Sequence, residues 1–295
     1  MTGTQQGLTR LMRLATYASV ATAVSLIFAK AGAWWQSDSV SMLATLTDSS
    51  LDLLASLVTL FAVYHALQPA DKEHRFGHGK AEPLAGLWQA LFVSLSAVFL
   101  LYQAIQRLIN PQPLSDSAAA SIGVMLFAIV ITGLLLLFQR YVIKQTGSTA
   151  IGADALHYKT DFLINISIIA AIIMTAAGWH RVDALMAIAI AIYIFHSGWQ
   201  IMRDAINLLM DHELPAEQRQ QIQSLVRQHS AVRGLHDLRT RRAGLKVFIQ
   251  LHLELDAQLS LKQASEICRE IEQDLQSHFA DAEVLIYPHP AGDCI

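Results

Sequence analysis

Apolar residues fall into six long runs along the first two thirds of the chain. The runs cover residues 14–35, 40–67, 84–109, 118–142, 149–177 and 182–210. Each is longer than the roughly 20 apolar residues that a helix needs to cross a bilayer. The first run is not typical of a cleaved signal peptide, because it ends in Trp34 and Trp35, a pair that favours the membrane interface. We therefore expect six membrane-spanning helices in residues 1–210.

From residue 211 onward the pattern becomes that of a small α+β domain. A helix is expected to begin at Pro215, because proline suits the first helical turn. Apolar and polar alternation predicts a strand at residues 246–256. Residues 233–241 can pair with this strand through a turn, and residues 283–287 are expected to form a last short strand. A second helix is expected after Ser260, a residue type that caps helix N-termini. The order αββαβ predicts helices on one face of a three-stranded sheet in residues 211–295.

Composition separates the two parts further. Hydrophobic residues make up 53% of the chain and charged residues 15%, against about 25% charged in an average soluble protein. Only 12 of the 21 Lys and Arg residues and 11 of the 24 Asp and Glu residues lie in the first 210 positions. This distribution excludes a disordered chain and an ordinary soluble enzyme. The net charge of −3 gives no support to nucleic-acid binding.

Basic residues predict the orientation in the membrane. They cluster before the first run, between the second and third, and at the end of the fourth: Arg10, Arg13, Lys72, Arg75, Lys80, Arg140 and Lys144. The loops on the other side carry one basic residue, Arg181. The positive-inside rule then places both termini in the cytoplasm. Cys268 and Cys294 form no CxxC motif, which fits a reducing compartment for the tail.

Ionisable residues inside the apolar runs are the main chemical signal. Asp48 and Asp52 in the second run are four residues apart, so both lie on one helix face. A central Asp costs about 2.5 to 3.5 kcal/mol on insertion scales. His157 and Asp161 repeat this spacing in the fifth run. If the two helices face each other, the four groups suit a tetrahedral Zn²⁺ ion. The alternatives are interhelical hydrogen bonds or a pair with Lys159.

Two further clusters lie outside the apolar runs. The loop after the second run contains three potential ligands for one ion, Asp71, His74 and His78. The alternative for this loop is a solvated group of charges. In the tail, adjacent strands can bring three histidines together, namely His236, His252 and His289, with Asp237 as a further potential ligand. Each of these histidines alone is typical of a surface residue, whereas the three together favour a bound metal ion.

These motifs resemble the cation diffusion facilitator family. The resemblance covers nearly the whole chain and is carried by Asp48-x-x-x-Asp52, His78-Gly79-Lys80-Ala81-Glu82, His157-Tyr158-Lys159-Thr160-Asp161 and Gly234-Leu235-His236-Asp237-Leu238-Arg239-Thr240-Arg241. It implies a homodimeric, proton-coupled exporter of Zn²⁺ in a bacterial inner membrane, with Cd²⁺ and Fe²⁺ as further substrates. It also implies a transport site made of Asp48, Asp52, His157 and Asp161, and a loop site made of Asp71, His74 and His78.

The resemblance further implies a charge interlock between Lys80 and Asp211, which would join the membrane domain to the tail. The sequence of this chain differs from the family pattern near its C-terminal end. Members carry His-x-Asp in the last strand and a further His early in the second tail helix, where this chain has Tyr287-Pro288-His289 and Ser265. We therefore expect a single structural or regulatory Zn²⁺ in the tail, held by His236, His252 and His289.

Two other function classes fit these residues less well than an exporter. A membrane metalloenzyme would need an open coordination position, and the chain has no HExxH motif and no nucleophile elbow. A cation channel would use the carboxylates as a selectivity ring, although channels favour weak sequential sites. The chain has no Walker motif, so ATP is not the expected energy source.

Overall fold

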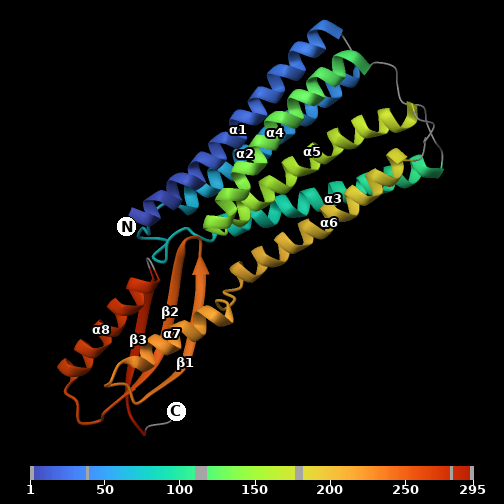
Figure 1. Ribbon diagram of the computed structural model, residues 1–295. Helices are drawn as coiled ribbons and strands as arrows, with labels where there is room; N and C mark the ends of the chain where they lie inside the picture. Colours follow the sequence, from blue (N-terminus) through green and yellow to red (C-terminus); the bar gives the residue numbers. More distant parts are fainter. Residues whose placement is uncertain (1–2, 38–39, 110–117, 177–181, 280–281, 293–295) are drawn as a thin grey trace. The chain divides into compact units, whose positions relative to one another are not determined.

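The structure is a computed structural model that describes residues 3–37, 40–109, 118–176, 182–279 and 282–292. It contains two compact units (Figure 1). One consists of residues 10–69 and 81–206, and the other of residues 1–9, 70–80 and 207–295. Cys294, Arg181 and the loop expected between the third and fourth apolar runs, residues 110–117, lie outside the described residues. The domain boundary expected between residues 210 and 211 stays a prediction.

Six long helices occupy the positions of the six apolar runs. They are α1 (Gly3–Ser37), α2 (Val40–Ala66), α3 (Ala81–Ile109), α4 (Ala118–Thr146), α5 (Thr149–Ala176) and α6 (Val182–Leu209). Among the described residues, all but α5 are long and apolar enough to cross a membrane by length and composition. The α5 helix has 28 residues, a length of about 42 Å at 1.5 Å per residue. This exceeds the roughly 30 Å hydrocarbon core.

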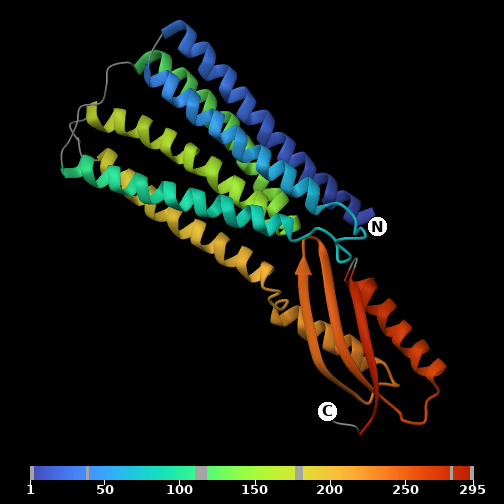
Figure 2. The same cartoon turned by 180° about the vertical axis from the view of Figure 1, so that it is seen from behind.

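The α5 helix lies inside the bundle and contacts α2, α3 and α4. Both views show α3 and α6 side by side, with α1, α2 and α4 grouped on the other side of α5 (Figures 1 and 2). Leu156 of α5 packs in one buried cluster with Val93 of α3 and Ile194 of α6. A Cβ on Gly198 of α6 would collide with the Ser94 hydroxyl of α3. The small residue therefore permits the close approach of these two helices.

The second unit has the predicted αββαβ order. Its elements are α7 (Ala216–Gln228), β1 (Gly234–Ala243), β2 (Lys246–Leu255), α8 (Leu261–His278) and β3 (Glu283–Pro290). The sheet order is β1-β2-β3, in which β2 pairs antiparallel with β1 and parallel with β3. The prediction of a helical membrane domain followed by an α+β domain is confirmed. Pro215 is the N-cap residue of α7, and Ser260 forms a capping box with Gln263 at α8.

One face of β2 supplies the core of this unit. Its alternate residues Ile249, Leu251 and Leu253 are fully buried and pack against Ile222 of α7 and Leu275 of α8. Both helices therefore cover the same face of the sheet, as the αββαβ order predicted.

The last strand differs from the prediction. It was expected to end at residue 287, whereas β3 continues to Pro290, which pairs with Leu255. His289 consequently lies on the strand and not after it. The prolines at 288 and 290 weaken the strand pattern in the sequence, but β3 is an edge strand, where proline is tolerated.

Candidate metal centres

The predicted membrane cluster brings residues of α2 and α5 together. A hydrogen bond joins His157 Nε2 and Asp52 Oδ1 at 2.7 Å. Asp161 Oδ2 lies 3.9 Å from the same nitrogen. One potential ligand atom from each of the three residues lies within 4.8 Å of the others. Because His157 and Asp161 are four residues apart on α5, the helix presents both toward Asp52.

The donor set fits a borderline transition metal such as Zn²⁺, which binds imidazole nitrogen and carboxylate oxygen. Ligands about 2.0 to 2.1 Å from a tetrahedral ion stand about 3.3 Å apart. The 2.7 Å contact between His157 and Asp52 must therefore widen by about 0.6 Å to admit an ion. Asp48 lies one turn before Asp52 on an exposed part of α2 and does not belong to the three-residue group.

Lys159 does not neutralise this cluster. Its ammonium donates a hydrogen bond to the Tyr193 hydroxyl of α6 and lies 4.7 Å from the centre of that ring. Among the described residues it makes no ion pair with Asp52 or Asp161. The interhelical hydrogen bond considered as an alternative does form, because the His157–Asp52 contact joins α5 to α2. That contact holds two potential metal ligands close to each other.

A further buried carboxylate lies one turn before His157 on α5, and the sequence reasoning missed it. Asp154 is 1% exposed. It accepts hydrogen bonds from Gln139 Nε2 at 2.7 Å, from Ser56 Oγ at 3.3 Å and from Gln89 Nε2 at 3.3 Å. Ser19 donates a fourth. An ionisable residue within the fifth apolar run was the signal that could have identified it.

The loop cluster also forms in the structure. Asp71 Oδ2 lies 3.3 Å from His78 Nε2, and Asp71 Oδ1 lies 3.5 Å from His74 Nδ1. Potential ligand atoms of all three lie within 4.8 Å of one another. Backbone N–H groups of His74 and Glu73 donate to Asp71 Oδ1. These bonds, chiefly that from His74, lower the pKa of the Asp71 carboxyl and keep it available as an anionic ligand.

The three tail histidines approach one another across the sheet. His236 and His252 pair directly in the β1–β2 register, with ring centres 5.3 Å apart. His252 and His289 stack at 4.8 Å, and a hydrogen bond of 2.8 Å joins His252 Nδ1 and His289 Nε2. Among the described residues, however, these three are not a group whose donor atoms all lie within 4.8 Å. Binding one ion would require rotation of the rings.

Acidic neighbours complete the tail cluster. Glu254 Oε1 lies 3.2 Å from His236 Nδ1, a contact that the sequence reasoning did not anticipate. Asp237 adopts a positive φ of 46° at a β-bulge, and its Oδ2 lies 3.8 Å from His252 Nε2. A hydrogen bond from Arg239 lowers the pKa of Asp237. That carboxylate is therefore already paired and is a weaker candidate for a ligand.

The ion pair between Lys80 and Asp211, which the family resemblance implied, is also formed. Lys80 Nζ lies 3.0 Å from Asp211 Oδ2, and Arg241 Nη1 lies 3.3 Å from Asp211 Oδ1. Asp211 has a positive φ of 56°.

A helical membrane bundle with a carboxylate–imidazole cluster among its helices, followed by a small α+β domain, defines a class of multi-pass membrane transporters for cations. Family models agree with this class. The model of the cation efflux transmembrane domain matches residues 16–210, and that of the cation efflux protein cytoplasmic domain matches residues 214–291. The chain therefore belongs to the cation efflux family, which is the cation diffusion facilitator family.

Curated relatives are similar in sequence to this chain over nearly its full length. The cation-efflux pump FieF of Klebsiella pneumoniae is 45% identical over 283 residues, which cover 96% of this chain and 94% of the relative. The pump of the same name from Salmonella arizonae is 44% identical over the same shares. The solved metal-bound C-terminal domain of the CzcD transporter from Thermotoga maritima is 27% identical, covers 28% of this chain and 100% of its own, and gives a TM-score of 0.26. The chain is a cation-efflux transporter and not an enzyme.

Proposed function

We propose that the protein exports Zn²⁺ in exchange for protons across a bacterial inner membrane, with both termini in the cytoplasm. The observation that carries this proposal is the cluster of Asp52, His157 and Asp161 between α2 and α5. Carboxylate oxygen and imidazole nitrogen are ligands that suit Zn²⁺, and the same ligands also bind Cd²⁺ and Fe²⁺, which we propose as further substrates.

Competition for these ligands couples the metal to protons. A carboxylate and a neutral imidazole bind a metal only in their deprotonated forms, so loading releases protons. On the outer side, protons return to His157 and to Asp52 or Asp161, and the metal leaves. Alternating exposure of this one site to the two sides then exchanges the two cations without a separate proton pathway.

Asp48 is proposed as the fourth ligand. A tetrahedral ion has four coordination positions, so three protein ligands leave one position unfilled. Asp48 lies four residues before Asp52, so both carboxylates belong to the same side of α2. A rotamer change at Asp48 on metal loading would complete the coordination and retain the i,i+4 pattern found on α5.

A transport assay tests this assignment. In proteoliposomes with an imposed pH gradient, Asp52→Ala and Asp161→Ala are expected to abolish zinc-dependent proton flux, because each removes a charged ligand. Asp204→Ala removes a carboxylate from an exposed position of α6 and is the matched control. Normal saturable flux in either ligand variant would refute the transport site.

The same assay separates an exporter from a channel. An exporter gives saturable zinc flux that follows the pH gradient, whereas a channel gives flux that follows only the electrochemical gradient of the metal. The cluster supports the exporter, because a site with an imidazole and two carboxylates binds more tightly than the weak sequential sites of channels.

The tail is proposed to serve assembly and regulation. It would hold a structural or regulatory zinc ion at His236, His252 and His289 and contribute to a homodimer. Zinc bound at the loop residues Asp71, His74 and His78 would add a second cytoplasmic site. Metal bound in these positions favours one packing of the two tails and thereby shifts the conformational equilibrium of the transporter.

A further inference from the structure

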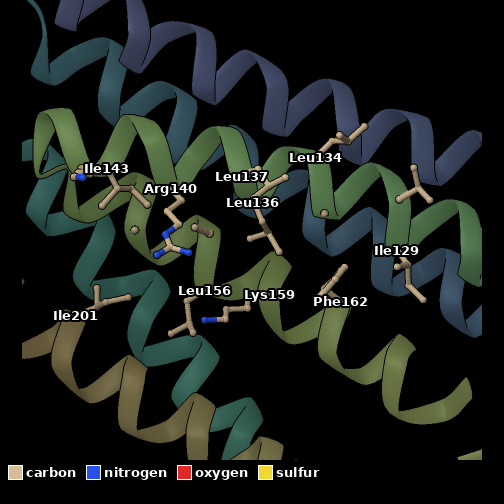
Figure 3. Close-up of a pocket in the computed structure, with 15 residues that line it drawn as sticks. Ile129, Leu134, Leu136, Leu137, Arg140, Ile143, Leu156, Lys159, Phe162 and Ile201 are labelled. Carbon is tan, nitrogen blue, oxygen red and sulfur yellow. The ribbon is translucent and has the colours of Figure 1, made fainter. Parts of the chain in front are cut away.

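The bundle contains a second large feature that the metal sites do not use. A groove of about 1010 Å³ lies between α4, α5 and α6 (Figure 3). This volume is at the upper end of the roughly 300–1,000 Å³ usual for ligand pockets. Its walls are mainly apolar and include Ile129, Leu134, Leu136, Leu137, Leu156 and Phe162. The groove opens along α4, where the side chains of Leu134 and Leu137 are 64% and 68% exposed.

Three cations line the same groove: Arg140 and Lys144 of α4 and Lys159 of α5. Within the described part of the chain, neither Arg140 nor Lys144 has a carboxylate within 4.0 Å. Lys159 is bound to the Tyr193 hydroxyl and has no carboxylate partner there either. The groove therefore combines apolar walls with positive charge that the described residues do not neutralise.

This chemistry excludes the groove as a route for the metal. Three positive side chains repel a divalent cation, and aliphatic walls offer it no ligands. The same features suit an amphiphile that has an anionic head and an apolar tail. Basic pockets between membrane helices on the cytoplasmic side are known to favour anionic lipid head groups.

Two of the three cations lie at one end of the groove. Arg140 and Lys144 belong to the last two turns of α4, at the side where the positive-inside pattern places the cytoplasm. Ile129 lies about 16 Å further along the helix from Arg140 at 1.5 Å per residue. Figure 3 shows Ile143 and Ile129 at opposite ends, with Arg140 and Lys159 directed into the space between the helices.

We propose that this groove binds an anionic phospholipid of the cytoplasmic leaflet. The phosphate would contact the Arg140 guanidinium and the Lys144 ammonium, and one acyl chain would follow Leu137, Leu134 and Ile129. Arginine suits this task because its planar guanidinium can donate two hydrogen bonds to one phosphate. The proposal does not depend on which metal the transporter carries, and its test measures lipid binding and not transport.

Native mass spectrometry of the full-length protein in detergent tests the proposal. Phosphatidylglycerol and phosphatidylcholine with identical acyl chains serve as probes, together with inorganic phosphate as a competitor. Wild type is expected to bind phosphatidylglycerol about tenfold or more tightly than phosphatidylcholine. Inorganic phosphate is not expected to displace it, because the acyl chain contributes most of the buried surface.

The double variant Arg140→Gln/Lys144→Gln is expected to lose the preference for phosphatidylglycerol, whereas the charge-conserving Arg140→Lys retains most of it. Arg203→Gln is the matched control, because it removes one exposed cation from α6 outside the groove. Equal binding of the two lipids by wild type, or an unchanged preference in the double variant, would overturn the proposal. Displacement by millimolar phosphate would also overturn it, since the groove would then recognise only an anion.

Discussion

Asp154 accepts hydrogen bonds from side chains of α1, α2, α3 and α4, although it belongs to α5. A buried carboxylate without partners would be costly, and these donors make its burial tolerable. His157 lies one helical turn further along the same helix. The network therefore fixes the rotation of α5 relative to its neighbours and, with it, the direction in which His157 and Asp161 point.

Replacement of Asp154 is expected to destabilise the bundle. Asp154→Ala leaves several buried donors unsatisfied, at about 1–3 kcal/mol each. Asp154→Asn is expected to cost less, because one oxygen acceptor remains, although its amide N–H groups then face the amide of Gln139. Thermal unfolding of the purified protein measures the difference, with Asp204→Ala as an exposed control. An Asp154→Ala protein as stable as wild type would contradict this role.

The residues that we propose for the transport site on α2 and α5 could be singled out from the sequence because their signal is local. Asp48 and Asp52 are four residues apart in one apolar run, and His157 and Asp161 are four residues apart in another, where an ionisable group is costly. The hydrogen-bond network of Asp154 could not be predicted in this way, because its donors are scattered over 120 residues of sequence and meet only in the folded bundle.

At the scale of elements, a loop packs against a turn. The loop at residues 70–80 lies in the same compact unit as the tail. A Cβ on Gly79 would collide with the carbonyl group of Ala243 at the β1–β2 turn. Gly244 in that turn has a positive φ of 60°, a conformation that favours glycine. The rings of Phe76 and Phe248 also meet in an edge-on contact, with centres 6.0 Å apart.

Gly79→Ala is expected to displace this loop from the turn. Because the loop carries Asp71, His74 and His78, its displacement should weaken metal binding there and speed amide hydrogen exchange in residues 70–80. Exchange measured by mass spectrometry checks this, with Gly32→Ala of α1 as control, since a Cβ at Gly32 meets no atom within 4 Å. Unchanged exchange in residues 70–80 would show that the close approach does not hold the loop.

At the scale of the whole molecule, charges divide the chain into a membrane part and a water-exposed part. Asp211 follows the last membrane helix and pairs with Lys80 and Arg241. Partial burial alone would raise the pKa of Asp211, but hydrogen bonds from Lys80 and Arg241 outweigh it and lower the pKa below the ordinary value of 3.8. A carboxylate with a lowered pKa stabilises the folded state above that value and loses its contribution as the pH falls below it.

Asp211→Asn tests this interlock. The substitution keeps a residue that tolerates the positive φ and removes the charge. We expect a loss of about 0.2–1 kcal/mol in local stability at pH 7, a range typical of exposed ion pairs. The difference from wild type should shrink below about pH 4, where the carboxylate of the wild type is progressively protonated. Hydrogen-exchange protection in residues 70–80 and 207–215 reports this difference, and a difference of the same size at pH 7 and at pH 3 would contradict the interlock.

The tail histidines give a second prediction at this scale. His252→Ala is expected to remove one bound zinc ion per chain, as counted by elemental analysis of the purified protein, while Asp52→Ala removes a different one. His278→Ala of α8 is the control, because His278 lies outside the cluster. Light scattering on the same samples measures the mass and tests the homodimer. A zinc count that is equal in wild type and His252→Ala would reject the tail site.

Sequence alone determined the six long helices, the αββαβ order and the candidate ligands, because hydrophobic periodicity and the cost of buried charge act over short stretches of chain. Tertiary structure decided which polar groups share a site. It placed Asp48 outside the three-residue group and surrounded the buried Asp154 with hydrogen-bond donors from four helices. It also formed the groove beside α4. These features depend on contacts between residues far apart in sequence, and no local pattern encodes such contacts.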